Sequence, residues 1–306
     1  MLYDNGQLLE LYSKAYQVSK EDFFLEKVNE TIQWLSEEML QEEGAFQAAQ
    51  DADSEGVEGK FYTWSYQELE QVIPEHLAWF AELYNLKSSG NWEEGVNILF
   101  QTSTYATVAA NHGMTEKELI SKLAAVKSQL LSVRNRRIHP GKDDKILSGW
   151  NGLMSTGLIQ AYFASGNKEA LRLAIRNREF ITKKMTIEGK LFRSYKNGQA
   201  YTPAFLEDYA ALIRTDLMLF EATGAASYLD AAVSLTNICL NEFFDESDGF
   251  FYFNNPSSEK LIANKKSCLT MSFLLPIPSW QEIYTGFLCL LTMKNIRKWP
   301  IKCWGE

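Results

Sequence analysis

The residues of this sequence that could do chemistry are most concentrated in the stretch from Gly44 to Trp64. Within it, four acidic side chains fall inside eight residues, and four aromatic rings flank them: Asp51, Asp53, Glu55 and Glu58, with Phe46, Phe61, Tyr62 and Trp64. Carboxylates accept hydrogen bonds from hydroxyl groups and aromatic rings cover apolar C–H faces, so the combination suits a polyhydroxylated ligand. Two glycines disfavour a helix here, and we expect a loop with short extended arms. A solvated acidic turn explains this stretch equally well.

Metal and cofactor chemistry finds little support in the sequence. Asp51, Asp53 and Glu55 match the first three ligand positions of a calcium-binding EF-hand loop, but the twelfth position, which needs a bidentate Glu, is Tyr62. The three histidines are scattered, and the four cysteines form no C-x-x-C pair. No glycine-rich nucleotide motif occurs. We therefore expect neither a metal site nor a cofactor.

The composition excludes several classes of partner. The chain has 306 residues, of which 46% are hydrophobic, enough for one large domain or two ordinary ones with a full core. A formal net charge of −9 without a basic block argues against nucleic acid and against anionic membranes. No uninterrupted apolar run is long enough to span a bilayer, and the N-terminus does not resemble a signal peptide. We expect a cytoplasmic protein.

The elements that must position these residues are helix hairpins. Apolar residues recur at steps of three and four, which is the period of an amphipathic helix. The pattern predicts helices over 1–16, 24–39, 65–73, 75–86, 115–137, 148–166, 168–185, 204–223 and 227–244, with short extended runs at 191–195 and 250–253.

The helix hairpins repeat along the chain. Each pair of helices is followed by an acidic residue, a glycine and aromatic residues, as in EEGAF at 42–46, IEGKLF at 187–192 and SDGFFY at 247–252. Each repeat is about 44 residues long, within the range of helical repeat units. The pattern predicts an all-α fold, an (α/α) toroid with short β-turn arms between hairpins. A superhelical array of helix pairs is the alternative, and the apolar character of 204–223 on most of its faces favours the closed ring.

In a toroid, the starts of the inner helices and the turns meet at one end, and this placement predicts a single site. The candidate catalytic groups, as acid, base or hydroxyl-binding carboxylates, are Asp51, Asp53, Asp144 and Asp208. The candidate substrate-binding residues are Tyr3, Asp4, Asn5, Glu55, Lys145, Trp150, Asn151, Glu207 and Tyr209. Competing explanations are helix capping for the acids at helix starts, core packing for Trp150, and a surface ion pair with Asp143 for Lys145.

Four ordered blocks resemble those of the thioredoxin-domain-containing, spermatogenesis-associated (YyaL-like) protein family: MLYDN, QDADSEG-EGKFYTW, DDKILSGWNGLM and FLEDYAALI. The resemblance covers roughly residues 1–266. It implies a toroid similar to six-hairpin glycosidases and N-acylglucosamine 2-epimerases. It also implies a thioredoxin-like domain in the full-length parent, and in that parent chain Met1 would be an internal methionine. The paired histidines of such epimerases have no counterpart in the matching blocks, which argues against epimerisation.

The function that the resemblance implies is that of a carbohydrate-active or carbohydrate-binding, glycosidase-like toroid whose ligand is a small sugar or glycoside. The fold resemblance alone supports the interpretation that such a protein is an enzyme. The alternative is a non-catalytic scaffold or substrate-docking module of a thioredoxin-domain protein.

The tail differs in character from the rest of the chain. Three of the four cysteines and three of the eight tryptophans follow Ser267. Translated in another frame, this segment resembles the family's next block, so we predict a partial toroid domain over 1–266 and an aberrant, frame-shifted and poorly ordered tail over 267–306. Such a chain should have low stability and little or no activity. A stop codon soon after Lys266 in the alternative frame would contradict the prediction.

Overall fold

The computed structural model describes residues 1–247 and 250–255, and the predictions for 267–306 concern residues outside this range. The described residues form two compact units. Of the described residues, unit 1 comprises 1–49, 143–247 and 250–255, and unit 2 comprises 50–142. The chain passes between the units in two short strands, β1 (Ala49–Gln50) and β4 (Lys142–Asp143).

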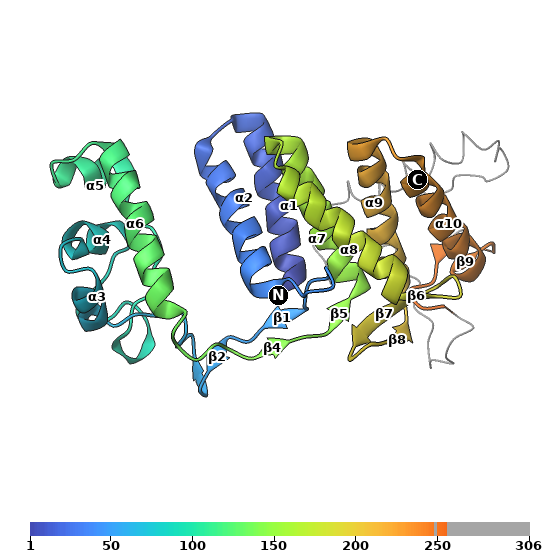
Figure 1. Ribbon diagram of the computed structural model, residues 1–306, viewed down its shortest axis with the longest axis horizontal. Helices are drawn as coiled ribbons and strands as arrows, with labels where there is room; N and C mark the ends of the chain where they lie inside the picture. Colours follow the sequence, from blue (N-terminus) through green and yellow to red (C-terminus); the bar gives the residue numbers. More distant parts are fainter. Residues whose placement is uncertain (248–249, 256–306) are drawn as a thin grey trace. The chain divides into compact units, whose positions relative to one another are not determined.

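The described residues of unit 1 form three helix hairpins, which confirms the prediction of an all-α toroid (Figure 1). The hairpins are α1 (Leu2–Ser19) with α2 (Asp22–Trp34), α7 (Ser148–Ser165) with α8 (Lys168–Lys184), and α9 (Leu206–Thr223) with α10 (Ala226–Glu242). A short π-helical segment, η1 (Leu35–Met39), extends α2. Helix α7 packs against both α1 and α9, so these three helices form an inner row, and each outer helix packs against the inner helix of its own hairpin.

Local signals set the hairpin turns. Gly166 and Gly224 end α7 and α9 with φ of 73° and 70°, a left-handed conformation that glycine adopts without steric cost. The side chain of Asn167 accepts hydrogen bonds from the backbone N–H groups of Glu169 and Ala170, and so caps the start of α8. The short connection therefore forces α8 to return antiparallel to α7.

Two glycines allow the inner helices to lie close together. A Cβ atom on Gly157 would come 2.4 Å from the carbonyl oxygen of Gly6, and one on Gly152 would come 2.9 Å from the Cβ of Ala211. Helix α7 thus meets α1 on one flank and α9 on the other at backbone distance. Close contact on two flanks explains why α7 is buried over most of its length.

Short antiparallel strands connect the hairpins of unit 1. The central strand β7 (Lys190–Lys196) pairs with three others: β5 (Ile146–Leu147), β6 (Thr186–Ile187) and β8 (Gln199–Pro203). The β7–β8 turn places Asn197 and Gly198 at φ of 52° and 80°, as a tight hairpin turn requires. After the third hairpin, β9 (Phe244–Asp245) pairs with β10 (Phe250–Phe251). Strands β6, β7 and β8 carry the chain from the end of α8 back to the start of the inner helix α9.

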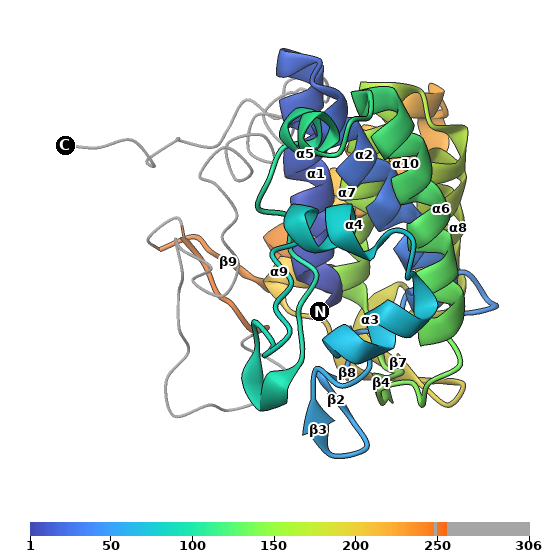
Figure 2. The ribbon, with the colours of Figure 1, turned by 90° about the vertical axis from the view of Figure 1, so that its left-hand side faces the viewer.

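Unit 2 has its own hydrophobic core, formed by Trp64, Leu69, Phe80, Leu119 and other buried side chains. Its elements are β2 (Asp53–Ser54), β3 (Val57–Glu58), α3 (Tyr66–Val72), α4 (Leu77–Leu83), the 3-10 turn η2 (Glu93–Gly95), α5 (Tyr105–Asn111) and α6 (Glu116–Arg134). Figure 2 shows the short helices α4 and α5 near the long helix α6. Thr115 and Glu118 form the predicted capping box at the start of α6.

Across the described residues, no helix has both the length and the apolarity that spanning a bilayer requires.

Candidate functional site

The acidic residues from Asp51 to Glu58 lie on a β-hairpin in unit 2. Strands β2 and β3 pair Asp53 with Glu58, and the two residues between the strands, Glu55 and Gly56, have φ of 55° and 76°. Asp51 accepts a hydrogen bond from the backbone N–H of Asp53, and Glu55 pairs with Lys60 at 2.7 Å. The acidic side chains of this hairpin are exposed. The loop with short extended arms is therefore present, with its acids on the surface of unit 2.

The predicted single site divides between the two units. Asp51, Asp53 and Glu55 belong to unit 2, and the other ten candidates belong to unit 1. The geometry of each group is consequently described within its own unit.

Asp144 and Lys145 lie in the loop that leads to the first residues of α7. Asp144 pairs with Lys196 at 2.5 Å, and Lys145 pairs with Asp143 at 3.2 Å. All four side chains are between 40% and 49% exposed, as surface ion pairs are. The hydrogen bond from Lys196 lowers the pKa of Asp144, so this carboxyl group is ionised at neutral pH.

The start of α9 carries a cluster of three charges, of which Asp208 is buried and Arg193 and Glu207 are half-buried. Nη1 of Arg193, on β7, lies 2.7 Å from Glu207 and 2.9 Å from Asp208. The guanidinium carbon of Arg193 also lies 4.8 Å from the centre of the Phe205 ring, a cation–π distance. The three side chains are 19%, 12% and 1% exposed, in the order Arg193, Glu207, Asp208. Strand β7 thus places the guanidinium group of Arg193 beside the two carboxylates of the α9 N-terminus.

Asp208 is the most constrained of these groups. Its Oδ1 accepts from the backbone N–H of Gly149 at 3.0 Å, and its Oδ2 accepts from the backbone N–H of Phe205 at 2.9 Å. Burial raises the pKa of Asp208 to about 6, although the charge of Arg193 and the bond from Phe205 oppose the rise. Asp208 therefore ties the start of α9 to the start of α7 and also orients Arg193.

An aromatic pair lies at the start of α7, where the backbone N–H of Gly149 binds Asp208. Trp150 follows Gly149 in α7, and its ring lies 4.8 Å from that of Tyr3 in α1, at an interplanar angle of 60°. The indole Nε1 of Trp150 is buried, and it has no hydrogen-bond partner within the described part of the chain. The first turns of all three inner helices thus contribute to one group of aromatic and charged side chains.

The remaining candidates have local or structural contacts. The amide of Asn151 accepts from the backbone N–H of Phe46 and donates to the backbone carbonyl groups of Phe46 and Leu147. Tyr209 is buried against Phe243, and burial raises the pKa of Tyr209 to about 12. Asp4 lies 3.8 Å from the amino terminus, and Asn5 donates to the carbonyl of Met1.

Arg193 is the residue of this cluster that the sequence analysis did not identify. It stands in the predicted extended run 191–195, but its partners follow 14 and 15 residues later. Alternation along the strand could have placed Arg193 on one face of the sheet. Only the fold of the β7–β8 hairpin brings it to the start of α9.

The comparisons with known proteins confirm the resemblance. No family model matches the chain. The chain is 28% identical over 287 residues to spermatogenesis-associated protein 20 of Homo sapiens, which covers 82% of this chain and 36% of that protein. It is 31% identical over 284 residues to an uncharacterized protein of Caenorhabditis elegans, covering 82% of this chain and 39% of the relative. The chain thus spans less than two fifths of the length of these relatives.

Among solved structures, the fold matches that of cellobiose 2-epimerase from Spirochaeta thermophila. The TM-score is 0.55 at 11% sequence identity, and the match covers 98% of this chain and 55% of the other. At this identity the likeness concerns the fold alone, which is the (α/α) toroid.

Proposed function

We propose, from the premise that this chain is a relative of the spermatogenesis-associated proteins with an (α/α) toroid fold, that it binds a carbohydrate at the N-terminal ends of its inner helices. The observation that carries the proposal is the Tyr3–Trp150 ring pair at the starts of α1 and α7, where the backbone N–H of Gly149 also binds Asp208 of the Arg193–Glu207–Asp208 cluster. Aromatic rings cover the C–H face of a sugar, and charged groups bond its hydroxyls. The matched toroid is a cellobiose 2-epimerase, which is consistent with a sugar ligand for this chain.

The residues of unit 1 take different roles in this proposal. Trp150 and Tyr3 provide the platform, while Glu207 and Arg193 bond the sugar hydroxyls. Asp208 holds Arg193 and Glu207 in position, because its own oxygens already accept hydrogen bonds from two backbone N–H groups and from Arg193. A catalytic role for Asp51, Asp53, Asp144 and Asp208 stays a prediction, as do the substrate-binding roles of Asp4, Asn5, Glu55, Lys145, Asn151 and Tyr209.

Of the predicted catalytic carboxylates, Asp208 has a pKa that suits carrying a proton near neutral pH. A pKa of about 6 resembles that of a general acid, whereas the exposed, ion-paired Asp144 has a lowered pKa. Cleavage of a glycoside would require Asp208 to exchange its bond with Arg193 for one with the substrate. Binding without cleavage requires no such exchange, and we therefore propose binding as the primary function.

Calorimetric titration with cellobiose, maltose, mannose and glucose tests the proposal. We expect one of these sugars to bind the wild-type chain, and Trp150→Ala to weaken that binding by about tenfold because the stacking ring is lost. Trp92→Ala is the matched control, since Trp92 is an exposed tryptophan of unit 2 and should leave the affinity unchanged. The full-length human relative should be titrated in parallel.

Failure of every sugar to bind either protein would contradict the proposal. The scaffold alternative would then remain, in which the toroid docks the thioredoxin-like domain of a longer parent. Chromatography of each sugar after incubation with the protein separates binding from turnover, because cleavage or isomerisation yields a new product peak.

A further inference from the structure

Helix α1 carries a polar stripe that consists of Tyr3, Gln7, Glu10, Lys14 and Gln17. These residues recur at steps of three and four, so they share one face of the helix. Tyr12 lies on the opposite face, where its ring packs 6.2 Å from that of Phe24 in the outer helix α2. The polar stripe therefore faces away from the outer helices, toward the inner side of the row formed by α1, α7 and α9.

The C-terminal part of the stripe is paired with other inner helices. Glu10 accepts two hydrogen bonds from Arg214 of α9, at 2.6 and 3.1 Å, and lies 2.7 Å from Lys14. Burial by itself raises the pKa of Glu10, but Arg214 and Lys14 outweigh it and lower the pKa. About two helical turns after Glu10, Gln17 accepts a hydrogen bond from Gln160 of α7 at 2.8 Å.

The N-terminal part of the stripe is not paired in this way. Nε2 of Gln7 and Nε1 of Trp150 are buried N–H donors that lack an acceptor anywhere in the described residues. Gln7 lies one helical turn after Tyr3, and Tyr3 contacts the Trp150 ring. A buried donor without an acceptor costs about 1–3 kcal/mol, so two of them beside one aromatic pair need a compensating interaction.

We infer that Gln7 and Trp150 donate hydrogen bonds to oxygen atoms of the bound sugar, and that the Glu10–Arg214 pair forms the floor beneath it. The inference rests on the proposed function. It adds Gln7 to the binding residues and places the inner end of the sugar site at the Glu10–Arg214 pair. A sugar ring suits this place because it presents hydroxyl and ring oxygens as acceptors at its edge and C–H groups on its face. Both donors then gain partners, while the rings of Tyr3 and Trp150 cover the face of the sugar.

The test compares Gln7→Leu with Gln17→Leu, two identical substitutions on the same face of the same helix. Cellobiose, maltose, mannose and glucose are titrated into each variant, and thermal unfolding is measured without sugar. Gln7→Leu should weaken sugar binding about tenfold, yet leave the melting temperature unchanged or higher, because it removes a donor that has no acceptor among the described residues. Gln17→Leu should lower the melting temperature and leave the affinity unchanged, because Gln160 loses its acceptor.

A spectroscopic readout follows the second donor directly. In a chain labelled with ¹⁵N-tryptophan, Trp150→Phe identifies the indole N–H signal of Trp150. Addition of the sugar that binds should shift this signal downfield, as formation of a hydrogen bond does.

The outcomes separate the inference from the proposed function. The inference is overturned if Gln7→Leu binds the sugar as strongly as the wild type does, or if sugar binding does not shift the Trp150 signal. The proposed function stands in either case. Absence of any sugar binding by the wild-type chain would overturn both.

Discussion

At Asp208, burial and hydrogen bonding compete at a single carboxylate. Two backbone N–H groups and one guanidinium favour its ionised form, but almost complete burial raises its pKa to about 6. In the unfolded chain an aspartate has a pKa of about 3.9. The folded state therefore binds a proton more tightly than the unfolded state does, and this contribution to stability is present below pH 4 and lost as the pH rises to about 6.

Asp208→Asn tests this linkage because asparagine keeps the shape without the titration. The free energy of unfolding of the wild type, minus that of the variant, should decrease by about 3 kcal/mol between pH 4 and pH 7, as a shift of roughly two pKa units implies. Urea unfolding of both proteins at a series of pH values measures this difference in the free energy of unfolding. Subtracting the variant removes the contributions of other carboxyl groups, such as Glu10. A difference that is constant with pH would show that the pKa of Asp208 is not raised.

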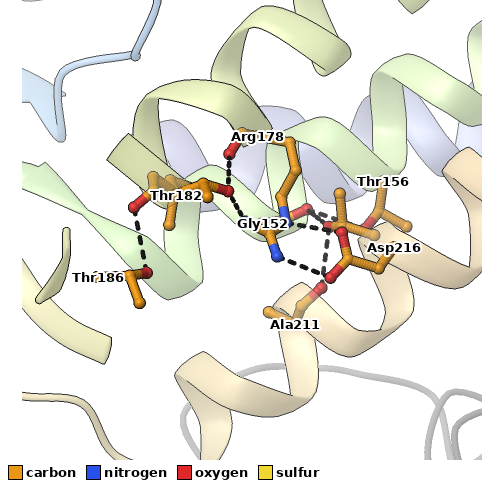
Figure 3. A network of polar contacts seen from close by, with 9 residues as sticks. Gly152, Thr156, Arg178, Thr182, Thr186, Ala211 and Asp216 are labelled. Atoms are coloured by element: carbon orange, nitrogen blue, oxygen red, sulfur yellow. Dashed lines mark hydrogen bonds and ion pairs between the residues drawn. The ribbon is translucent and has the colours of Figure 1, made fainter. Parts of the chain in front are cut away.

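Among the structural elements, α8 and α9 are joined by a buried ion pair (Figure 3). Arg178 of α8 forms a bidentate contact with Asp216 of α9, with its Nε 2.7 Å from Oδ1 and its Nη2 2.8 Å from Oδ2. Arg178 also contacts Thr182 one turn along α8, and Thr215 donates to the carbonyl groups of Gly152 and Ala211. Burial raises the pKa of Asp216, and Arg178 opposes that rise.

Removing one member of this pair should cost more than removing both. Arg178→Met leaves a buried carboxylate without its partner and should lower the free energy of unfolding by about 3–5 kcal/mol, whereas Arg178→Met with Asp216→Leu should recover most of the loss. Lys183→Met, which breaks an exposed ion pair on the same helix, is the control and should cost less than about 1 kcal/mol. Chemical denaturation gives all three values. Equal losses in the single and double variants would contradict the expectation.

The close contact between α1 and α7 depends on Gly157. Gly157→Ala would place a methyl group against the backbone of Gly6, so the two helices must separate. We expect a loss of about 2 kcal/mol, even though alanine has the higher helix propensity. Ser121→Ala, at an exposed position of α6, should change stability by less than about 0.5 kcal/mol. An increase in the melting temperature of Gly157→Ala would show that α1 and α7 accommodate the added methyl group without separating.

At the scale of the whole molecule, the chain divides into two units with separate cores. Unit 2 buries Trp64, Phe80, Leu119 and Leu123 among other apolar side chains, and has capped helices of its own. A fragment of residues 50–142 should therefore fold by itself and unfold cooperatively. Circular dichroism during heating tests this expectation.

A core substitution shows whether the fragment has the same structure as unit 2. Leu123→Ala removes a side chain that is 3% exposed and should cost about 2–5 kcal/mol in the fragment and in the whole chain alike. A fragment without cooperative unfolding would mean that unit 2 needs the rest of the chain to fold.

The sequence by itself determined the helix hairpins, their turns and the toroid class. Apolar periodicity, the glycines at 166 and 224 and the capping box at Thr115 act within about one helical turn, so they can be recognised in a single segment. The same applies to Trp150 and Tyr3, which the repeat placed at the starts of two inner helices.

Only the tertiary structure decided which of the candidate groups meet and which are buried. It placed Asp51 and Asp53 on a surface hairpin of unit 2, exposed Asp144 to solvent, and enclosed Asp208 with Arg193. It also paired Glu10 with Arg214, which lies 204 residues away, while Nε2 of Gln7 has no acceptor in the described chain. Burial and ion pairing depend on side chains that approach from distant segments, and the energy that sets a pKa or orients a donor comes from those neighbours rather than from the residue's own helix.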